Sequence, residues 1–434
     1  MRKRGVYLAV AAAALAACGE NWYKGNLHMH SLWSDGNVFP EDAAMWYRDH
    51  GYHFVCLSDH QILQLNPEEW LEIGSRKLSK AQADQYIANH PASVRVKKEG
   101  DKSFVRLLTI WELKRMLDQP EAFLMIPGHE VNRVIGGLQV HANVINVRDT
   151  IPYRYGATAL ETFARLDTAL RTWGAEQDVP TLFMLNHPTW PCYDIGPDVL
   201  IALPQIRFFE LCNADGGNEY PTQCPWYTLE KFWDIVNAFR IEDGYDAVFG
   251  TATDDTHNYT DPKANARPGE GWICVRAGHL DCDALVQAMW RGDFYASTGA
   301  TLEVVDFDAA TGTLKVKAAP ECGAGTVIRF TTTKAGFDRT AEPFEDPARD
   351  KKPARKGLRY SDGIGRDVKT VDGLEASYTM ETDDLYVRAT VVSSRRTPSR
   401  VRNEPEFETA WTQPYGWRLW QARNPEKARL KPLK

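Results

Sequence analysis

The stretch Gly25-Asn26-Leu27-His28-Met29-His30, followed by Ser34-Asp35-Gly36, decides both the fold class and the candidate site. It predicts a first strand over 25–30. Side chains alternate between the two faces of a strand, so His28 and His30 are expected to point the same way and to be able to bind one ion. The turn at 34–36 can swing the Asp35 carboxylate back toward the two imidazoles. The sequence therefore predicts a strand that delivers metal ligands at its end.

The same rhythm of a short apolar strand, a polar residue and an amphipathic helix recurs from about Lys24 to Ser297. Such alternation is typical of repeated βα units. A helix is expected over 40–50, with Pro40 at an early helical position. In barrels of parallel strands the C-terminal rim carries the active site, and each predicted strand brings a polar residue there. Further strands are expected at 52–57, 123–127, 140–145, 182–185, 208–211 and 247–250.

The distribution of histidines is the most informative feature of the sequence. Of 11 histidines, seven lie at predicted strand ends beside carboxylates or within compact polar motifs. Isolated buried charges cost several kcal/mol unless they are paired or bind metal, so this concentration indicates a metal site. No cysteine belongs to the set, which favours Zn, Mn or Fe over a thiolate-type site. The candidate ligands are His28, His30, Asp35, His60, Glu130, His141, His187, Asp255 and His257.

These motifs resemble those of the polymerase and histidinol phosphatase (PHP) superfamily, in the family's order and over roughly residues 24–297. The matching segments are Leu27-His28-Met29-His30-Ser31 with Ser34-Asp35-Gly36, then Ser58-Asp59-His60, Gly128-His129-Glu130, Asn186-His187-Pro188 and Asp255-Thr256-His257. The resemblance implies an α/β fold, a distorted (β/α)7 TIM-like barrel, with a site for two or three divalent ions.

The resemblance also implies how the ligands divide among the ions. His28, His30, Glu130 and Asp255 would hold the first ion, and Glu130 would bridge to a second ion held by His141 and His187. Asp35, His60 and His257 would hold the third. The segment Phe209-Glu210-Leu211-Cys212-Asn213 is similar to the family's E-x-x-N stretch and implies that Asn213 lies at the rim.

Three features depart from minimal members of the superfamily. The doublet Asp254-Asp255 leaves two carboxylates to choose between, and the D-x-H spacing favours Asp255. A polar insertion over 67–119 is expected to be helical and to border the site. After residue 297 the pattern changes to Thr/Val/Gly-rich alternation, so residues 298–434 are expected to form an antiparallel, sandwich-like β domain, with a long loop over 342–369. These additions are closer to the secreted, carbaryl-hydrolase-like branch.

The N-terminal residues read as an export signal. A basic start at 2–4 precedes a short apolar run at 6–17, which ends in Leu15-Ala16-Ala17-Cys18. This ending resembles the lipobox of bacterial lipoproteins, so residues 1–17 are expected to be removed and Cys18 to be lipidated. The barrel domain would then cover 18–297. The protein is expected in the bacterial cell envelope, in the periplasm or on the outer membrane, with the lipid as its only membrane contact. Cys192, Cys212 and Cys224 are close enough in sequence to form disulfides, but their pairing stays open.

Charge and composition restrict the partners. The net charge of -7 and pI of about 5.9 provide no basic surface for a nucleic-acid backbone. The 14 tryptophans are many, and Trp33, Trp190, Tyr193 and Tyr259 lie in the same loops as ligands. These rings could be core, or they could stack on a sugar or aromatic group of a small-molecule substrate.

The resulting functional hypothesis is a metal-dependent hydrolase whose nucleophile is a hydroxide shared by two ions. A phosphoesterase acting on an extracytoplasmic phosphate ester is the first choice, with Glu130, Asp255 and Asn213 at the reacting centre. A phosphate substrate would require an added cation, for which Arg133 is the candidate. Hydrolysis of carbamates, esters or amides at the same site is the alternative. A non-enzymatic alternative is a surface-anchored binding protein that has lost its activity.

Overall fold

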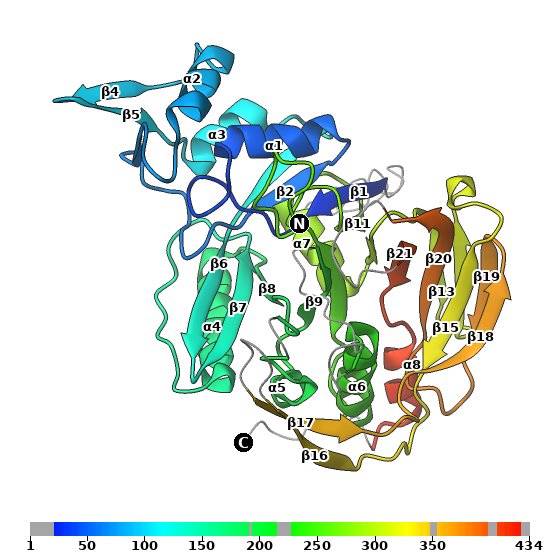
Figure 1. Ribbon diagram of the computed structural model, residues 1–434. Coiled ribbons are helices and arrows are strands. Elements are labelled where there is room, and N and C mark those ends of the chain that lie inside the picture. Colours follow the sequence, from blue (N-terminus) through cyan, green and yellow to red (C-terminus); the bar gives the residue numbers. More distant parts are fainter. Residues whose placement is uncertain (1–20, 191–192, 215–226, 348–353, 398–405, 427–434) are drawn as a thin grey trace, which may run out of the picture.

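One thirteen-stranded sheet runs through the protein in the computed structural model, which describes residues 21–190, 193–214, 227–347, 354–397 and 406–426 (Figure 1). The expected signal peptide, Cys18, Cys192 and Cys224 lie outside the described residues. In spatial order the strands are β10 (Phe249–Thr253), β9 (Phe208–Asn213), β8 (Leu182–Leu185), β7 (Leu138–Ile145), β6 (Leu124–Ile135), β2 (Phe54–Leu57), β1 (Asn21–Asn26), β11 (Trp272–Ala277), β12 (Phe294–Ser297), β21 (Phe407–Thr412), β20 (Arg388–Arg396), β15 (Val327–Thr332) and β18 (Arg366–Asp372).

The strands from β10 to β1 form the α/β part of the sheet, and helices cover them. The predicted helix over 40–50 is α1 (Pro40–Asp49), which begins with a proline where its missing N–H costs nothing. Strand β2 is buried at all four positions, as expected for a strand covered on both faces. Helices α4 (Ala159–Gln177), α5 (Pro197–Ala202), α6 (Leu229–Glu242) and α7 (Cys282–Arg291) share one hydrophobic core with these strands.

The prediction of uniformly parallel βα units is wrong at β7, which pairs antiparallel with both β6 and β8. The reason is the pair Gly136-Gly137, whose φ values of 60° and 82° form a tight turn between β6 and β7. A two-residue turn leaves no room for a crossover helix, so the chain returns directly. The reversal still leaves His141 at the same edge of the sheet as Glu130.

The ladder formed by the described strands does not close into a ring, because β10 is one edge of the sheet. A single parallel bridge joins Met29, just past β1, to Thr256, just past β10. In this bridge the His30 N–H donates to the Thr256 carbonyl at 2.9 Å. The bridge brings the two ends of the α/β part together at the candidate site.

The insertion differs from the helical prediction. It contains a three-stranded sheet of β3 (Trp70–Glu72), β5 (Lys102–Arg106) and β4 (Val96–Glu99) beside α2 (Lys80–Asn89) and α3 (Ile110–Leu117). Capping boxes at Ser79 and Thr109 start the two helices. Strand β4 is largely exposed and rich in lysine and glutamate, which suit a helix equally well, so the sequence predicted a helix where a strand forms.

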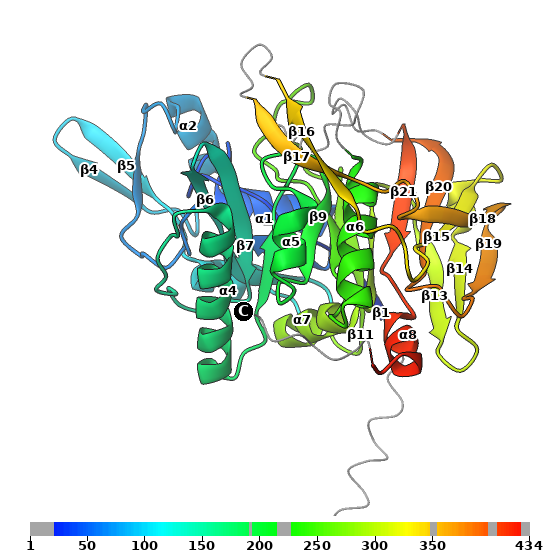
Figure 2. The ribbon, with the colours of Figure 1, turned by 90° about the horizontal axis from the view of Figure 1, so that it is seen from below.

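The C-terminal part has two antiparallel sheets. Strands β13 (Leu302–Asp308), β14 (Thr313–Ala318) and β19 (Glu375–Thr379) form the second sheet, which Figure 2 shows beside β15 and β20. Side chains of both sheets share one core, including Val316, Phe330 and Val391. This is the layered arrangement expected of a sandwich-like β domain. Helix α8 (Trp417–Arg423) ends the described part.

The expected loop over 342–369 is instead mostly strand. It contains the hairpin β16 (Ala341–Asp346) and β17 (Arg355–Tyr360) and the start of β18. Its charged side chains are tolerated because much of the hairpin and of β18 is exposed. Within the described ranges, no helix combines the length and apolar character required to cross a membrane.

Candidate metal centre

All nine predicted ligands lie at one edge of the α/β part of the sheet. His28 and His30 follow β1, and His60 follows β2. Glu130 and His141 lie within the β6–β7 hairpin, where a parallel bridge pairs His60 with Glu130. Asp35 lies in the turn that follows His30. The remaining ligands are His187 after β8 and Asp255 and His257 after β10. The first strand ends at Asn26, earlier than predicted, so His28 and His30 lie on the extended segment beyond it.

Glu130 is the centre of the cluster, and its two oxygens face different sets of histidines. Oε1 lies 3.2 Å from His141 Nδ1 and 3.5 Å from His187 Nε2. Oε2 lies 2.6 Å from His60 Nδ1 and 3.5 Å from His28 Nε2. The carboxylate is completely buried. Each oxygen therefore belongs to a different group of candidate ligands.

Asp255 faces the cluster and Asp254 faces away from it. Asp255 Oδ1 lies 3.1 Å from His28 Nε2 and 3.0 Å from His30 Nε2. Asp254 instead accepts three backbone N–H bonds, from residues 269–271, and the hydroxyl of Tyr47. A φ of 49° at Asp255 places its backbone in the left-handed region. The structure thus brings Asp255, as predicted, among the other candidate ligands.

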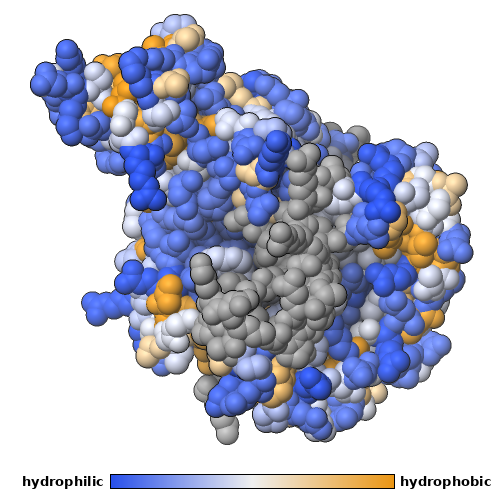
Figure 3. All heavy atoms as spheres, in the orientation of Figure 1, coloured by the Kyte–Doolittle hydropathy of each residue, from blue (hydrophilic) through white to orange (hydrophobic). Residues whose placement is uncertain are grey.

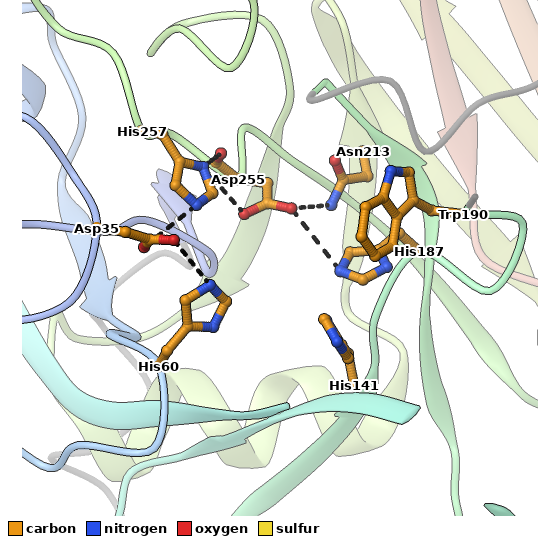
Figure 4. A pocket seen from close by; sticks show the side chains of 8 residues that line it. All are labelled: Asp35, His60, His141, His187, Trp190, Asn213, Asp255 and His257. Carbon is orange, nitrogen blue, oxygen red and sulfur yellow. Dashed lines mark hydrogen bonds and ion pairs between the residues drawn. The ribbon is translucent and has the colours of Figure 1, made fainter. Parts of the chain in front are cut away.

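Asp35 joins a third group at the mouth of the site. Its oxygens lie 3.4 Å from both His60 Nε2 and His257 Nε2 (Figure 4). One of them lies 3.8 Å from His30 Nδ1. Three groups within the described residues have ligand atoms close enough to share an ion: His28 with His30 and Glu130; Glu130 with His141 and His187; and His30 with Asp35, His60 and His257.

The chemistry of the cluster fits divalent ions. Four buried atoms, His28 Nε2, His60 Nδ1, His141 Nδ1 and Glu130 Oε2, make no hydrogen bond of acceptable geometry within the described structure. They approach oppositely charged groups but do not align with them as donor and acceptor. Unpaired buried polar atoms cost about 1–3 kcal/mol each. Cations held by the three groups would satisfy all four.

The titration behaviour reflects the same crowding. Burial alone would raise the pKa of Glu130, but the surrounding histidines, His28 first among them, bring that pKa well below its usual range. Burial alone would lower the pKa of His60, yet its contacts with Asp35 and Glu130 raise it to about 10. Without ions, histidines thus supply the positive charge; ligation requires neutral imidazole, so binding ions would release protons.

A buried carboxylate that the sequence prediction did not single out, Glu210, organises the ligands. It lies 2.7 Å from His28 Nδ1 and accepts from the backbone N–H of His187 at 2.7 Å. Asn213 donates to Glu210 and, at 3.1 Å, to Asp255. Glu210 fixes which ring nitrogen of His28 faces the cluster. Glu210 belongs to the E-x-x-N stretch, for which the resemblance implied only that Asn213 lies at the rim.

Asp59 has a similar role in the turn that presents Asp35. It is buried and accepts from the backbone N–H and the hydroxyl of both Ser31 and Ser34. Four hydrogen bonds to one carboxylate explain why the turn holds a defined shape.

Arg133 does not lie where the sequence prediction placed it. Its side chain is exposed and stacks 5.2 Å from the ring of Tyr155, away from the cavity. Alternation along β6 explains this, because Arg133 is three residues from Glu130 and so faces the other side. Of the four aromatic candidates, Trp190 lines the cavity, whereas Trp33, Tyr193 and Tyr259 do not.

The cavity at the cluster has a volume of about 210 Å³. Its lining comprises Asp35, His60, His141, His187, Trp190, Asn213, Asp255 and His257. Trp190 is 37% exposed, and its ring lies 5.5 Å from that of His187. In Figure 3 the surface below the insertion is hydrophilic and hollowed. Among the residues that the structure describes, the lining includes no lysine or arginine.

Comparison with known proteins gave structural similarities alone. No protein-family model and no curated protein matches the sequence. A two-domain protein from Bacteroides vulgatus that contains a predicted PHP-like metal-dependent phosphoesterase is similar over 83% of this chain and 96% of its own, with 14% identity and a TM-score of 0.38. A candidate metal-dependent phosphoesterase from Bifidobacterium adolescentis is similar over 56% and 90%, with 13% identity and a TM-score of 0.30. An amidohydrolase from Chromobacterium violaceum is similar over 57% and 88%, with 13% identity and a TM-score of 0.27.

Proposed function

We propose that this protein is a metal-dependent hydrolase of the PHP type, and that it is a phosphoesterase. The observation that carries the proposal is Glu130, a completely buried carboxylate whose two oxygens face separate groups of histidines. No structural role requires that arrangement, since nearby ring nitrogens are left without hydrogen bonds. The distorted (β/α)7 barrel is part of the same proposal, and the bridge between Met29 and Thr256 supports it.

Three ions fit the ligands in the order that the motifs imply. The first would be held by His28, His30 and Glu130 together with Asp255, which lies within 3.1 Å of both histidines. The second would be held by Glu130, His141 and His187, and the third by Asp35, His60 and His257. Zn, Mn or Fe suits these nitrogen and oxygen donors. When bound, such ions lower the pKa of water and offset the charge of phosphoryl oxygens.

The chain's own residues supply orientation and surroundings. Asn213 donates to Asp255 and Glu210, so it holds two carboxylates in fixed positions at the inner wall. Trp190 forms an apolar wall beside His187 and can stack on a sugar or aromatic group of the substrate. The proposed substrate is a small molecule that carries such a group next to the scissile bond.

The absence of lysine and arginine from the described lining favours a second candidate, hydrolysis of an uncharged carbamate, ester or amide. A phosphate ester brings charge that fixed cations would help to neutralise, and Arg133 faces away. We still prefer a phosphate ester as the substrate, because the motifs resemble those of the PHP superfamily.

The direct test is to remove the bridging ligand. We expect Glu130→Ala and His187→Ala to lose metal and to lower hydrolysis by at least about 100-fold, because two-ion sites act as a unit. Turnover of phosphomonoesters, phosphodiesters, carboxylesters and aryl carbamates would be measured with metal content, before and after chelation. Glu345→Ala and His279→Ala remove the same side-chain types at positions 73% and 62% exposed and serve as controls. Unchanged turnover in a Glu130→Ala protein of unchanged metal content would contradict the proposal.

We propose in addition that the protein acts outside the cytoplasm, anchored by a lipid at Cys18. The support is the sequence that precedes this cysteine. Labelled palmitate should enter the wild-type protein and not Cys18→Ala. Equal labelling of the two would refute the anchor without touching the proposed chemistry.

A further inference from the structure

His141 has a defined partner on the side of its ring that faces away from Glu130. Its Nε2 lies 3.2 Å from Gln139 Oε1, while Nδ1 lies 3.2 Å from Glu130 Oε1. An amide oxygen only accepts hydrogen bonds, so Gln139 holds the proton on Nε2. The lone pair of Nδ1 is then free to face an ion.

The backbone of Gln139 is in turn fixed by a carboxylate from another loop. Its N–H donates to Asp194 Oδ2 at 2.6 Å. Asp194 belongs to the segment that follows His187 and Trp190, and its side chain is only 1% exposed. One carboxylate therefore ties the β6–β7 hairpin to the loop that carries a second candidate ligand.

The other oxygen of Asp194 is held by the C-terminal half of the chain. Arg355, the first residue of β17, donates from Nε at 2.9 Å and from Nη2 at 2.7 Å to Asp194 Oδ1. Nη2 also lies 3.2 Å from the carbonyl of Gly137, in the β6–β7 turn. Figures 1 and 2 show the β16–β17 hairpin reaching under α5 and α6, away from its own sandwich.

The pair is nearly dry, because the Arg355 side chain is only 11% exposed. Removing one partner of a desolvated charge pair leaves the other charge buried and uncompensated, and the surrounding backbone then moves to hydrate it. The backbone that would move here is the start of β7, which carries Gln139 and follows the Gly136-Gly137 turn.

We propose that Arg355 is a positioning residue of the metal centre: through Asp194 and Gln139 it holds the Nδ1 atom of His141 toward Glu130. The C-terminal half thus contributes to the site without lining it. This inference rests on the proposed function only in that ions bind at Glu130.

The test is titration of the metal-free full chain with Mn²⁺ by calorimetry, which requires no substrate. Gln139→Leu should weaken the affinity of the site that includes His141 by about 10- to 100-fold, the usual effect of losing such an outer partner. Arg355→Ala should weaken it by about 10-fold, at the low end of that range, because it acts through two further groups. Gln139→Glu retains an acceptor and should restore affinity. Lys356→Ala, the exposed neighbour on β17, is the matched control and should bind as the wild type does.

Thermal unfolding of each variant separates positioning from folding. Weaker Mn²⁺ binding by folded Arg355→Ala, together with rescue in Gln139→Glu, supports the proposal. Wild-type affinity in folded Arg355→Ala, or in Gln139→Leu, overturns it while leaving the proposed function intact. If Arg355→Ala does not fold, the proposal is tested by comparing the Mn²⁺ affinities of Gln139→Leu and Gln139→Glu. A wild-type chain that binds no Mn²⁺ overturns both.

Discussion

At the scale of single residues, the neighbouring aspartates Asp254 and Asp255 have the same side chain but different roles. Asp255 faces the histidines, whereas Asp254 binds three backbone N–H groups and Tyr47, and burial raises its pKa to about 6. We expect Asp255→Asn to lose at least one ion per chain. Asp254→Asn should retain its ions but lose about 1–3 kcal/mol of unfolding free energy, since an amide offers one acceptor where the carboxylate has two. Metal analysis and urea unfolding of the two variants measure this; a loss of metal restricted to Asp254→Asn would reverse the assignment.

At this scale the sequence predicts candidate ligands but not the residues that hold them. His28, His30 and Glu130 belong to motifs that are weak one by one and that predict a metal site only as a set with the other strand-end residues. The roles of Glu210 and Gln139 depend on which distant side chain lies beside them. No local pattern shows this, because a buried glutamate or a strand glutamine is common without any ligand nearby.

The contact between α1 and α2 gives a pH-dependent prediction at the scale of elements. Glu41, in the first turn of α1, is buried and accepts a hydrogen bond from Tyr86 of the insertion. Burial raises the pKa of Glu41 from 4.5 to about 7. The folded state therefore keeps its proton where the unfolded state has lost it. Stability from this group is present below pH 4.5 and is lost as the pH rises through 7, by roughly 3 kcal/mol.

Glu41→Gln removes that dependence. Between pH 5 and pH 8 the wild-type melting temperature should fall further than that of Glu41→Gln, whose amide does not ionise. Glu72→Gln, on the insertion strand β3 and 37% exposed, serves as a control. Parallel curves for wild type and Glu41→Gln would show that Glu41 is already ionised in the folded protein.

At the scale of elements, the sequence predicted where strands lie along the chain better than whether neighbouring strands pair parallel or antiparallel. The strand over 182–185 and the helix from Pro40 were placed correctly, because apolar runs and a proline are local signals. The reversal at β7 depends on two glycines that also suit an ordinary loop. The pairing of β4 with β5 was missed because the lysines and glutamate of β4, which is largely exposed, suit a helix equally well.

A buried ion pair spans the two halves at the scale of the whole molecule. Arg388 on β20 binds Asp234 on α6 at 2.6 Å, each side chain is 2% exposed, and Tyr386 donates to the same carboxylate. Arg388→Ala leaves that carboxylate uncompensated and should cost about 3–5 kcal/mol. Arg396→Ala, which loses an exposed pair on the same strand, should cost under 1 kcal/mol. Urea unfolding compares them, and equal midpoints would show that the halves do not depend on this contact.

The pairing of β12 with β21 also has a consequence for the order in which the chain is made. The two strands are hydrogen-bonded neighbours, with Tyr295 opposite Thr412, yet more than a hundred residues separate them. During synthesis the edge of β12 therefore has no β21 partner until more than a hundred further residues have been translated. Open edges pair readily with other chains. For that interval the β12 edge that later pairs with β21 is open to pairing with other chains.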